Sequence, residues 1–272
     1  MSDWHRETLR SANEAAWDLV AAKYAPEVER DVALLRSGGS SLLAPERAAL
    51  APLLRACQCA VHLQCSHGTD TLSLWGLGAQ QISGHDFSAE MLMLARRKAE
   101  LLRASATWVQ ADVLAPPAAL AGTADLVYTG KGALPWVFDL SLWARGVVRL
   151  LAPGGHLYLY EGHPLNWVWA PDAAELRLRD EGDYFASTAR VNVDFPGAFL
   201  ERSASPGDAP ARAFERQWGL GEVVSALAQA GLALVRLTEH PEHFWPQFPR
   251  VPTDQLQRLP HTFSLLMRRP AA

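Results

Sequence analysis

Residues 61–88 read V-H-L-Q-C-S-H-G-T-D-T-L-S-L-W-G-L-G-A-Q-Q-I-S-G-H-D-F-S. The stretch opens with an apolar run, Gly68 then permits a tight turn, and Thr69 begins a helix that ends before Gly78. A second strand pattern follows and closes at Asp86. This order of strand, turn, helix and strand, with an acid at the end of the second strand, is typical of one half of a dinucleotide-binding fold. In such a half the helix N-terminus favours an anionic group, and the acid accepts hydrogen bonds from ribose hydroxyls. The stretch therefore predicts a site for an adenosine-like ligand.

Helix and strand patterns alternate along most of the remaining chain. The expected helices after this stretch lie at residues 88–103, 139–151 and 220–230. The expected strands lie at residues 107–110, 125–129, 156–160, 233–238 and 262–267. Strands that alternate with helices pair in parallel, so the pattern predicts the α/β class, with an open, mostly parallel sheet and helices on both faces.

Two segments of the chain lie outside the strand and helix alternation: the N-terminal residues and a stretch after the fifth expected strand. Residues 7–36 are helical in pattern, although Pro26 should divide them, and residues 45–55 form a further helix. We therefore expect residues 1–56 to be an N-terminal helical cover and residues 57–272 to be the main domain. The alternation stops over residues 161–217, which we interpret as an insertion after the fifth strand.

Composition excludes several classes of protein. The formal net charge of −4 offers no general attraction to nucleic acid or to an anionic membrane, so neither is an expected partner. The N-terminal residues are charged and lack the apolar core of a signal sequence. The three cysteines, Cys57, Cys59 and Cys65, are an odd number in one strand region and form no disulfide framework. The expected compartment is the reducing cytoplasm.

The same cysteines, with His67, could be interpreted as a metal site. Residues two apart on a strand share a face, so Cys59 and Cys65 should join a buried apolar stripe. Buried cysteine behaves as a small apolar residue, and a structural zinc site usually has a tighter pair-and-pair spacing. We therefore expect no metal.

The chain resembles the class I S-adenosylmethionine-dependent methyltransferases over about residues 10–269. It is most similar to a bacterial branch whose first motif reads L-Q-C-x-x-G-x-D-T, which stands here at residues 63–71. The later motifs are G-H-D-F-S at 84–88, Q-A-D-V at 110–113, D-L-V-Y-T-G at 125–130 and L-L-A-P-G-G-H-L at 150–157. Their order and spacing together are specific. The resemblance implies a Rossmann-like fold, S-adenosylmethionine as cofactor and methyl transfer as activity.

The resemblance also implies contacts to the adenosine part of the cofactor. Asp86 would bind the ribose hydroxyls and Phe87 would flank the adenine. Asp112 would meet the adenine amino group, and Val113 would contribute a backbone amide. Asp86 could instead be a solvated strand end or a cap for the following helix, and Asp112 could be an ordinary turn residue.

The remaining implied contacts lie near the methionine part and the sulfonium. Gln64 and Gly68 would lie against the methionine portion, and Thr129 and Gly130 would sit beside the sulfonium. The common first motif has an acid where His62 stands and glycines where Gln64 and Ser66 stand, so this turn must use different polar contacts. Gln64 could also satisfy only loop backbone, and Gly68 could permit only the turn.

Catalysis by such an enzyme depends mainly on alignment, because the cofactor supplies the reactive group. If a general base exists, His163 is the first candidate, since histidine accepts a proton near neutral pH, and Glu161 is the second. Either could instead be a turn residue. Trp136 and Trp167 follow the fourth and fifth strands, where ligands of open α/β sheets lie. An aromatic wall there would suit an apolar or aromatic small-molecule acceptor.

Other functions stay open at this point. A non-catalytic S-adenosylmethionine-binding protein would keep the fold and lose the acceptor site. A nicotinamide-dependent oxidoreductase would want G-x-G-x-x-G in the first turn, where Gln64 and Ser66 stand. A nucleic-acid methyltransferase is disfavoured by the net acidity and by T-G-K-G at residues 129–132 in place of an N-P-P-aromatic motif. We predict methyl transfer to a small molecule.

Overall fold

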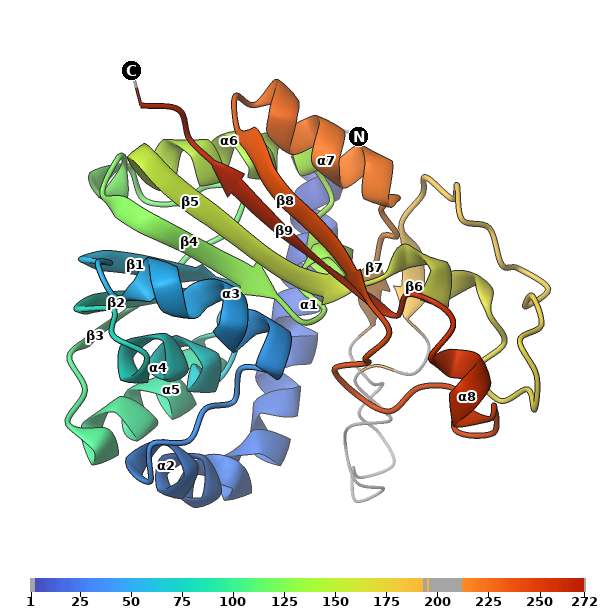
Figure 1. The fold of residues 1–272 in the computed structure, drawn as a ribbon, viewed down its shortest axis with the longest axis horizontal. Coiled ribbons are helices and arrows are strands. Elements are labelled where there is room, and N and C mark those ends of the chain that lie inside the picture. The colour runs from blue at the N-terminus through green and yellow to red at the C-terminus, as the bar shows by residue number, and fades with distance from the viewer. Residues whose placement is uncertain (1–2, 193–194, 196–211, 272) are drawn as a thin grey trace.

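The computed structural model describes residues 3–192, 195 and 212–271. A seven-stranded sheet in the order β3-β2-β1-β4-β5-β9-β8 forms the centre of this fold (Figure 1). The strands that pair in parallel are β1 (Cys59–Leu63), β2 (Gln81–Asp86), β3 (Ala106–Gln110), β4 (Ala124–Gly130) and β5 (Leu151–Gly162). β9 (Thr262–Arg268) runs antiparallel to β5 and to β8 (Ala233–His240). The prediction of a mostly parallel, Rossmann-like sheet is confirmed.

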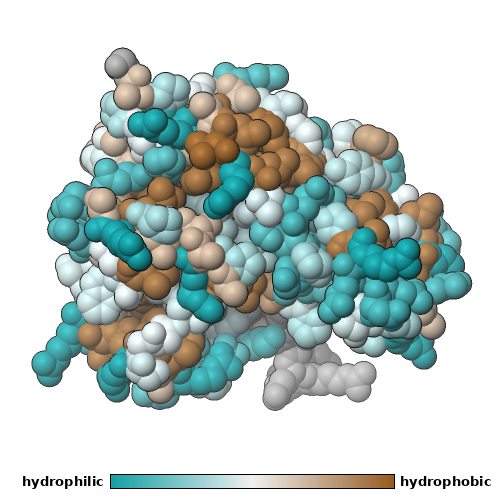
Figure 2. All heavy atoms as spheres, viewed as in Figure 1, coloured by the Kyte–Doolittle hydropathy of each residue, from teal (hydrophilic) through white to brown (hydrophobic). Residues whose placement is uncertain are grey.

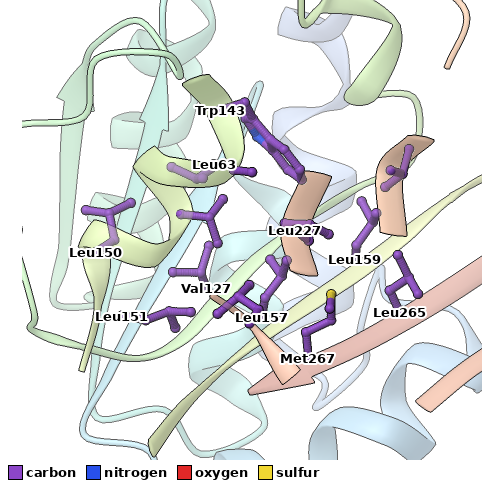
Figure 3. Packing of buried hydrophobic residues seen from close by; sticks show 14 of the residues in the cluster. Leu63, Val127, Trp143, Leu150, Leu151, Leu157, Leu159, Leu227, Leu265 and Met267 are labelled. Carbon is purple, nitrogen blue, oxygen red and sulfur yellow. The ribbon is translucent and has the colours of Figure 1, made fainter. Parts of the chain in front are cut away.

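Alternating strand residues divide the core between the two faces of the sheet. Val61 and Val127 face α6 (Leu140–Leu150) and α7 (Leu220–Gln229), and Figure 3 shows this packing around Trp143 and Leu227. The residues between them, such as Ala60 and Leu126, join the opposite cluster with α3 (Ala44–Leu54), α4 (Thr69–Gly76) and α5 (Ala89–Leu102). Side chains that alternate along a strand point to opposite faces, so both faces are apolar and both are covered by helices.

The N-terminal helices lie against the α5 side of the molecule. α1 (Asp3–Tyr24) contacts α5 and β7, and α2 (Val28–Arg36) contacts α4 and α5. The short helix η1 (Ala25–Glu27) separates them and contains Pro26, as the sequence predicts. The division of the chain at residue 57 into cover and main domain stays a prediction.

Few regular elements lie between β5 and α7. The structure has η4 (Pro164–Val168) and a two-stranded sheet of β6 (Arg190–Asn192) and β7 (Ala213–Glu215). Residues 193–194 and 196–211, which belong to the predicted insertion, lie outside the described residues. After β8 the proline-rich loop leads to a single turn of helix, α8 (Thr253–Leu256).

β8 is an edge strand with exposed apolar side chains. Leu234, Val235 and Leu237 are 38–53% exposed, and Figure 2 shows hydrophobic residues gathered over this strand. Among the helices that the structure describes, none is long and apolar enough to cross a membrane.

Candidate functional site

A cavity of about 210 Å³ lies where the carboxyl ends of β1, β2 and β3 meet. Parallel strands end at the same edge of a sheet, so residues far apart in sequence gather there. The residues that follow these strands and line the cavity are Gln64, Phe87, Asp112 and Val113. The loop after β4 adds Trp136 and Phe138, and α1 closes the opening with Arg6, Glu7, Arg10 and Asn13. The structure therefore brings four of the predicted cofactor residues to one cavity.

Gln64 has an unusual backbone and an incompletely bonded side chain. Its φ of 56° lies in the left-handed region, which a residue other than glycine enters only when the surroundings require it. The side-chain Nε2 donates to the carbonyl of Ala133 at 2.8 Å. The Oε1 atom is buried and has no hydrogen-bond partner among the described residues. A buried acceptor without a donor costs free energy, so Gln64 presents an acceptor suited to a ligand N–H or O–H.

Asp86 holds the first turn to the start of α5. Its Oδ2 accepts from the amide of Ser66 at 2.8 Å, and its Oδ1 accepts from the amide of Ser88 at 2.9 Å. The residue is 8% exposed and is not among the residues that line the cavity. Burial raises the pKa of Asp86 to about 6, although the backbone amides oppose that shift. Each carboxylate oxygen retains a second lone pair, so these contacts leave room for a further donor.

Gly68 is required by packing as well as by its backbone. Its φ is +77°, and a Cβ atom there would lie 2.6 Å from both the Ala95 Cβ and the Trp108 ring. The ring of Trp108 also covers Gly84, where a Cβ would lie 2.4 Å from it. Gly68 thus lets the turn pass directly over Trp108, and it is not among the residues that line the cavity.

We expect Gly68→Ala to destabilise the protein by about 2–4 kcal/mol, because it adds left-handed strain to overpacking against Trp108. Gly76 of α4 is the matched control, since a Cβ there would meet nothing within 4 Å. Gly76→Ala should instead stabilise the helix by about 0.5–1 kcal/mol. Urea unfolding of both variants measures this difference, and equal stabilities would contradict the packing argument.

Asp112 lies between the cavity and the cover helix. Its Oδ1 accepts from the amide of Leu114 at 2.8 Å, which is a turn contact, while its Oδ2 lies 3.9 Å from the Arg10 Nε. Its side chain is 31% exposed. Both the turn role and a ligand contact are therefore compatible with its position.

Thr129 and Gly130 end β4 beneath the loop that carries Trp136. The hydroxyl of Thr129 is buried without a hydrogen-bond partner among the described residues. A Cβ on Gly130 would lie 2.0 Å from the Tyr160 carbonyl oxygen, so only glycine fits between these strands. Neither residue lines the cavity.

The Glu161 carboxylate holds the loop after β4. Its Oε1 accepts from the amides of Gly132 at 2.6 Å and Gly162 at 2.8 Å, and its Oε2 accepts from the amide of Leu134 at 3.0 Å. Burial raises the pKa of Glu161 despite these contacts. The geometry gives Glu161 a role in shaping the loop that reaches the cavity wall at Trp136.

The His163 ring is engaged at both nitrogens. Its Nδ1 accepts from the amide of Leu165 at 3.1 Å, and its Nε2 lies 3.0 Å from the Oε1 of Glu239. Burial lowers its pKa, so the ring is neutral near pH 7 with the proton on Nε2. His163 and Glu161 are not among the residues that line the cavity, and their catalytic roles stay predictions.

His67 and Thr69, near the end of the first motif, contact the N-terminal helix α2 through a buried ion pair. Lys98 of α5 is fully buried, and its Nζ lies 2.8 Å from the Asp31 Oδ2 and 2.7 Å from the His67 Nδ1. Asp31 also accepts from the hydroxyl of Thr69 at 2.8 Å. This group, Asp31, His67, Thr69 and Lys98, is called the Lys98 cluster below. It ties α2 to the turn after β1, so His67 and Thr69 help to hold the N-terminal helices against the sheet.

A second buried group ties α3 to the same region. Lys131 lies 2.9 Å from Asp70 and 3.5 Å from Glu46, and the Tyr128 hydroxyl donates to Glu46 at 2.6 Å. His62, which stands at the position of the usual acid, shares a hydrogen bond of 2.8 Å with Thr71. Burial lowers the pKa of His62 to about 3, so it stays neutral. Polar residues of the first motif therefore fasten the cover to the sheet.

The sequence interpretation missed the contribution of the cover to the cavity. Arg6, Glu7 and Arg10 alternate in charge at helical spacing, a pattern more typical of a solvated face than of a ligand site. It also missed the aromatic cluster of Trp17, Trp136 and Phe195, whose ring centroids lie 4.9–5.4 Å apart. Trp136 reaches the cavity wall, as the sequence suggested.

Trp167 does not have the predicted position on the cavity wall. The guanidinium of Arg190 covers its ring at 4.1 Å from the centroid, and the cavity lining does not include it. Among the residues that the structure describes, no His, Cys, Asp and Glu side chains gather in a metal-binding group.

Comparison with known proteins gives matches at the level of domain and fold. Residues 60–155 match the protein family described as "Methyltransferase domain". No curated protein matches the chain in sequence. The structure is similar to an S-adenosylmethionine-dependent methyltransferase from Mesorhizobium loti, with a TM-score of 0.59, 21% identity, and coverage of 83% of this chain and 98% of that chain.

Further structural neighbours have the same fold at lower identity. A methyltransferase of the same kind from Clostridium acetobutylicum has a TM-score of 0.56 at 13% identity, covering 82% of this chain and 88% of that one. The geranyl diphosphate C-methyltransferase of Streptomyces coelicolor, solved with Mg²⁺, geranyl-S-thiolodiphosphate and S-adenosyl-L-homocysteine, has a TM-score of 0.54 at 13% identity, covering 82% and 76%. Residues 60–155 therefore match a methyltransferase domain, and the fold around them is the fold of solved S-adenosylmethionine-dependent methyltransferases.

Proposed function

We propose that the protein transfers the methyl group of S-adenosylmethionine to a small-molecule acceptor by in-line displacement. The observation that carries the proposal is the cavity at the carboxyl ends of β1, β2 and β3, which Gln64, Phe87, Asp112 and Val113 line. Ligands of open α/β sheets bind at this edge. The first motif at residues 63–71 supports our proposal that the chain belongs to the branch with L-Q-C-x-x-G-x-D-T.

The residues present suit the adenosine part of the cofactor. Phe87 and Val113 offer apolar contact for the adenine, and the Asp112 carboxylate offers an acceptor for its amino group. We assign the ribose hydroxyls to Asp86, through the lone pairs that the amides of Ser66 and Ser88 leave available. In this proposal Asp86 accepts hydrogen bonds both from the backbone amides of Ser66 and Ser88 and from the ribose hydroxyls of the cofactor.

The residues near the methionine part suit a charged, polar group. Gln64 lines the cavity and holds a buried oxygen without a donor among the described residues, so a small shift of its side chain would let it accept from a ligand amine. Gly68 and Gly130 are required by packing against Trp108 and against the Tyr160 backbone, and we assign them to the methionine part and the sulfonium only through the resemblance. A cavity of about 210 Å³ is smaller than most ligand pockets, which hold roughly 300–1,000 Å³.

Positioning is the main contribution of the protein in this proposal. The sulfonium of the bound cofactor supplies a methyl group with a good leaving group. The chain aligns the acceptor and excludes water, for which α1 and the Trp17, Trp136 and Phe195 cluster provide the cover. His163 could act as a base only after release from Leu165, so its catalytic role and that of Glu161 stay predictions.

The proposed acceptor is small and carries apolar or aromatic surface. The loop after β4 presents Trp136 and Phe138 to the cavity, and such rings favour apolar contact. The acceptor of one structural neighbour, geranyl diphosphate, is also a small molecule with a long apolar part.

The acceptor proposal is tested by measuring S-adenosylhomocysteine production with a panel of small apolar and aromatic nucleophiles. We expect turnover that depends on one chemical class within the panel and is lost without acceptor. Release of S-adenosylhomocysteine with added RNA or protein, and with no small molecule, would contradict the acceptor class.

A further inference from the structure

A second, more open hollow of about 420 Å³ adjoins the cofactor cavity. It lies between the N-terminal end of α6 and one side of α7, and it shares Arg6 and Phe138 with the cavity. The other side chains that the argument uses are Asp139, Arg216, Trp218 and Glu222. We call this hollow the Arg216 groove. Its volume lies within the range of small-molecule sites.

Arg216 is the cation of this groove without a direct partner among the described residues, although Glu222 and Asp139 attract it at longer range. Its guanidinium makes no hydrogen bond or ion pair with any residue that the structure describes, and its buried Nε lacks an acceptor. The guanidinium instead lies 3.6 Å from the centroid of the Trp218 ring. A stacked guanidinium keeps its outward donors available, and a buried N–H without an acceptor costs free energy until one is supplied.

The carboxylates of the groove are already occupied. Asp139 accepts from the amide of Leu142 at 2.9 Å and pairs with Arg6 at 2.8 Å. Glu222 accepts from the amide of Gly219 at 2.8 Å, which caps α7. The charge without a direct partner is therefore positive, and the groove is complementary to an anion.

The groove is rigidly joined to the wall of the cofactor cavity. The Arg216 amide donates to the carbonyl of Pro135 at 2.8 Å, and the Trp218 indole donates to the carbonyl of Val137 at 2.8 Å. Pro135 and Val137 flank Trp136 and precede Phe138, which line the cavity. A molecule bound at Arg216 would therefore lie beside the site proposed for the methyl donor.

We propose that the Arg216 groove binds the anionic group of a small organic acceptor, with Arg216 donating to its oxygens and Trp218 and Phe138 contacting its apolar part. This inference rests on the proposed function, because it assigns a charge to the acceptor of that reaction. A carboxylate and a phosphate present the same oxygen acceptors to arginine, so the shared chemistry is an oxyanion on a small apolar or aromatic molecule.

The test is calorimetric titration with benzoate, phenyl phosphate and neutral benzamide. All titrations use protein saturated with S-adenosylhomocysteine, so that the added anions do not compete for the cofactor cavity. We expect at least one anion to bind the wild type more tightly than benzamide, and the stronger of the two identifies the oxyanion. Arg216→Met should weaken that anion at least about tenfold, which corresponds to about 1.4 kcal/mol.

Arg145→Met is the matched control, because Arg145 is exposed on α6 outside the groove and its loss removes the same charge. Its anion affinity should stay at the wild-type value. Arg216→Gln is a second variant that retains a stem over Trp218 and should also lose the anion. Anion binding that is absent in the wild type, or unchanged in a folded Arg216 variant, would overturn the proposal. Titration of the wild type with S-adenosylhomocysteine, before any anion is added, tests the cofactor separately, so the two failures are distinguishable.

Discussion

Asp86→Ala is expected to weaken S-adenosylmethionine binding by more than about tenfold, or about 1.4 kcal/mol. The change removes the proposed acceptor of the ribose hydroxyls, a charge-assisted hydrogen bond. It also leaves the amides of Ser66 and Ser88 without their acceptor, which adds a cost of about 1–3 kcal/mol each where those amides are buried. Calorimetry on a variant shown to be folded by circular dichroism measures the first effect, and thermal unfolding measures the second.

The pH dependence separates the ligand role of Asp86 from its structural role. Burial raises the pKa of Asp86 to about 6, so the carboxylate is ionised above that pH and accepts best there. Below pH 6 a proton must leave before the ribose hydroxyls bind. The affinity for S-adenosylhomocysteine should therefore be constant above about pH 7 and fall by up to about tenfold per pH unit below pH 6. Asp86→Asn cannot titrate and should lose this dependence. An unchanged affinity in Asp86→Ala would remove the ribose assignment.

Lys98→Met is expected to destabilise the protein by about 3–5 kcal/mol. Lys98 is fully buried and Asp31 is 5% exposed, so the change leaves the buried carboxylate with only the exposed Arg30, 3.3 Å from its Oδ1, as a cationic partner. In the wild type burial would raise the pKa of Asp31, but the Lys98 ammonium and the Thr69 hydroxyl reverse that and hold it below its usual value. Urea unfolding at neutral pH measures the loss.

Two further variants show whether the buried pair causes this effect. Arg97 is the neighbouring cation on α5, 57% exposed and 3.8 Å from Glu100, so Arg97→Met should cost less than about 0.5 kcal/mol. The double variant Asp31→Asn, Lys98→Met removes both charges and should be more stable than Lys98→Met alone. If Lys98→Met cost no more than Arg97→Met, the Lys98 cluster would not fasten the cover as described.

Local sequence patterns predicted the sheet well. The run before Gln64, the glycine at 68 and the acid at 86 define a strand, a turn and a second strand, and the structure has each of them. These features depend on neighbouring residues, so periodicity and turn chemistry suffice to find them. The same patterns placed Gln64, Phe87, Asp112 and Val113 at strand ends, and the fold gathers them at one cavity.

Contacts between distant segments were not predictable in this way. Lys98 has the position of an ordinary helix-surface lysine in α5, and only the packing of α2 buries it against Asp31. Trp17 and Phe195 meet across the chain, at a centroid distance of 4.9 Å, without any shared motif. His163 follows β5 as a catalytic residue would, yet its ring is directed to Leu165 and Glu239. Such partners depend on tertiary packing, which a single sequence does not encode in its local pattern.

The most direct test of the account is calorimetric titration of the wild-type protein with S-adenosylmethionine, S-adenosylhomocysteine and NAD. We expect the first two compounds to bind. NAD should not bind, because the first turn lacks the G-x-G-x-x-G motif and has Gln64 where a glycine of that motif would stand. Binding of NAD alone, or no binding of either S-adenosyl compound, would contradict the assignment of this cavity to the methyl donor.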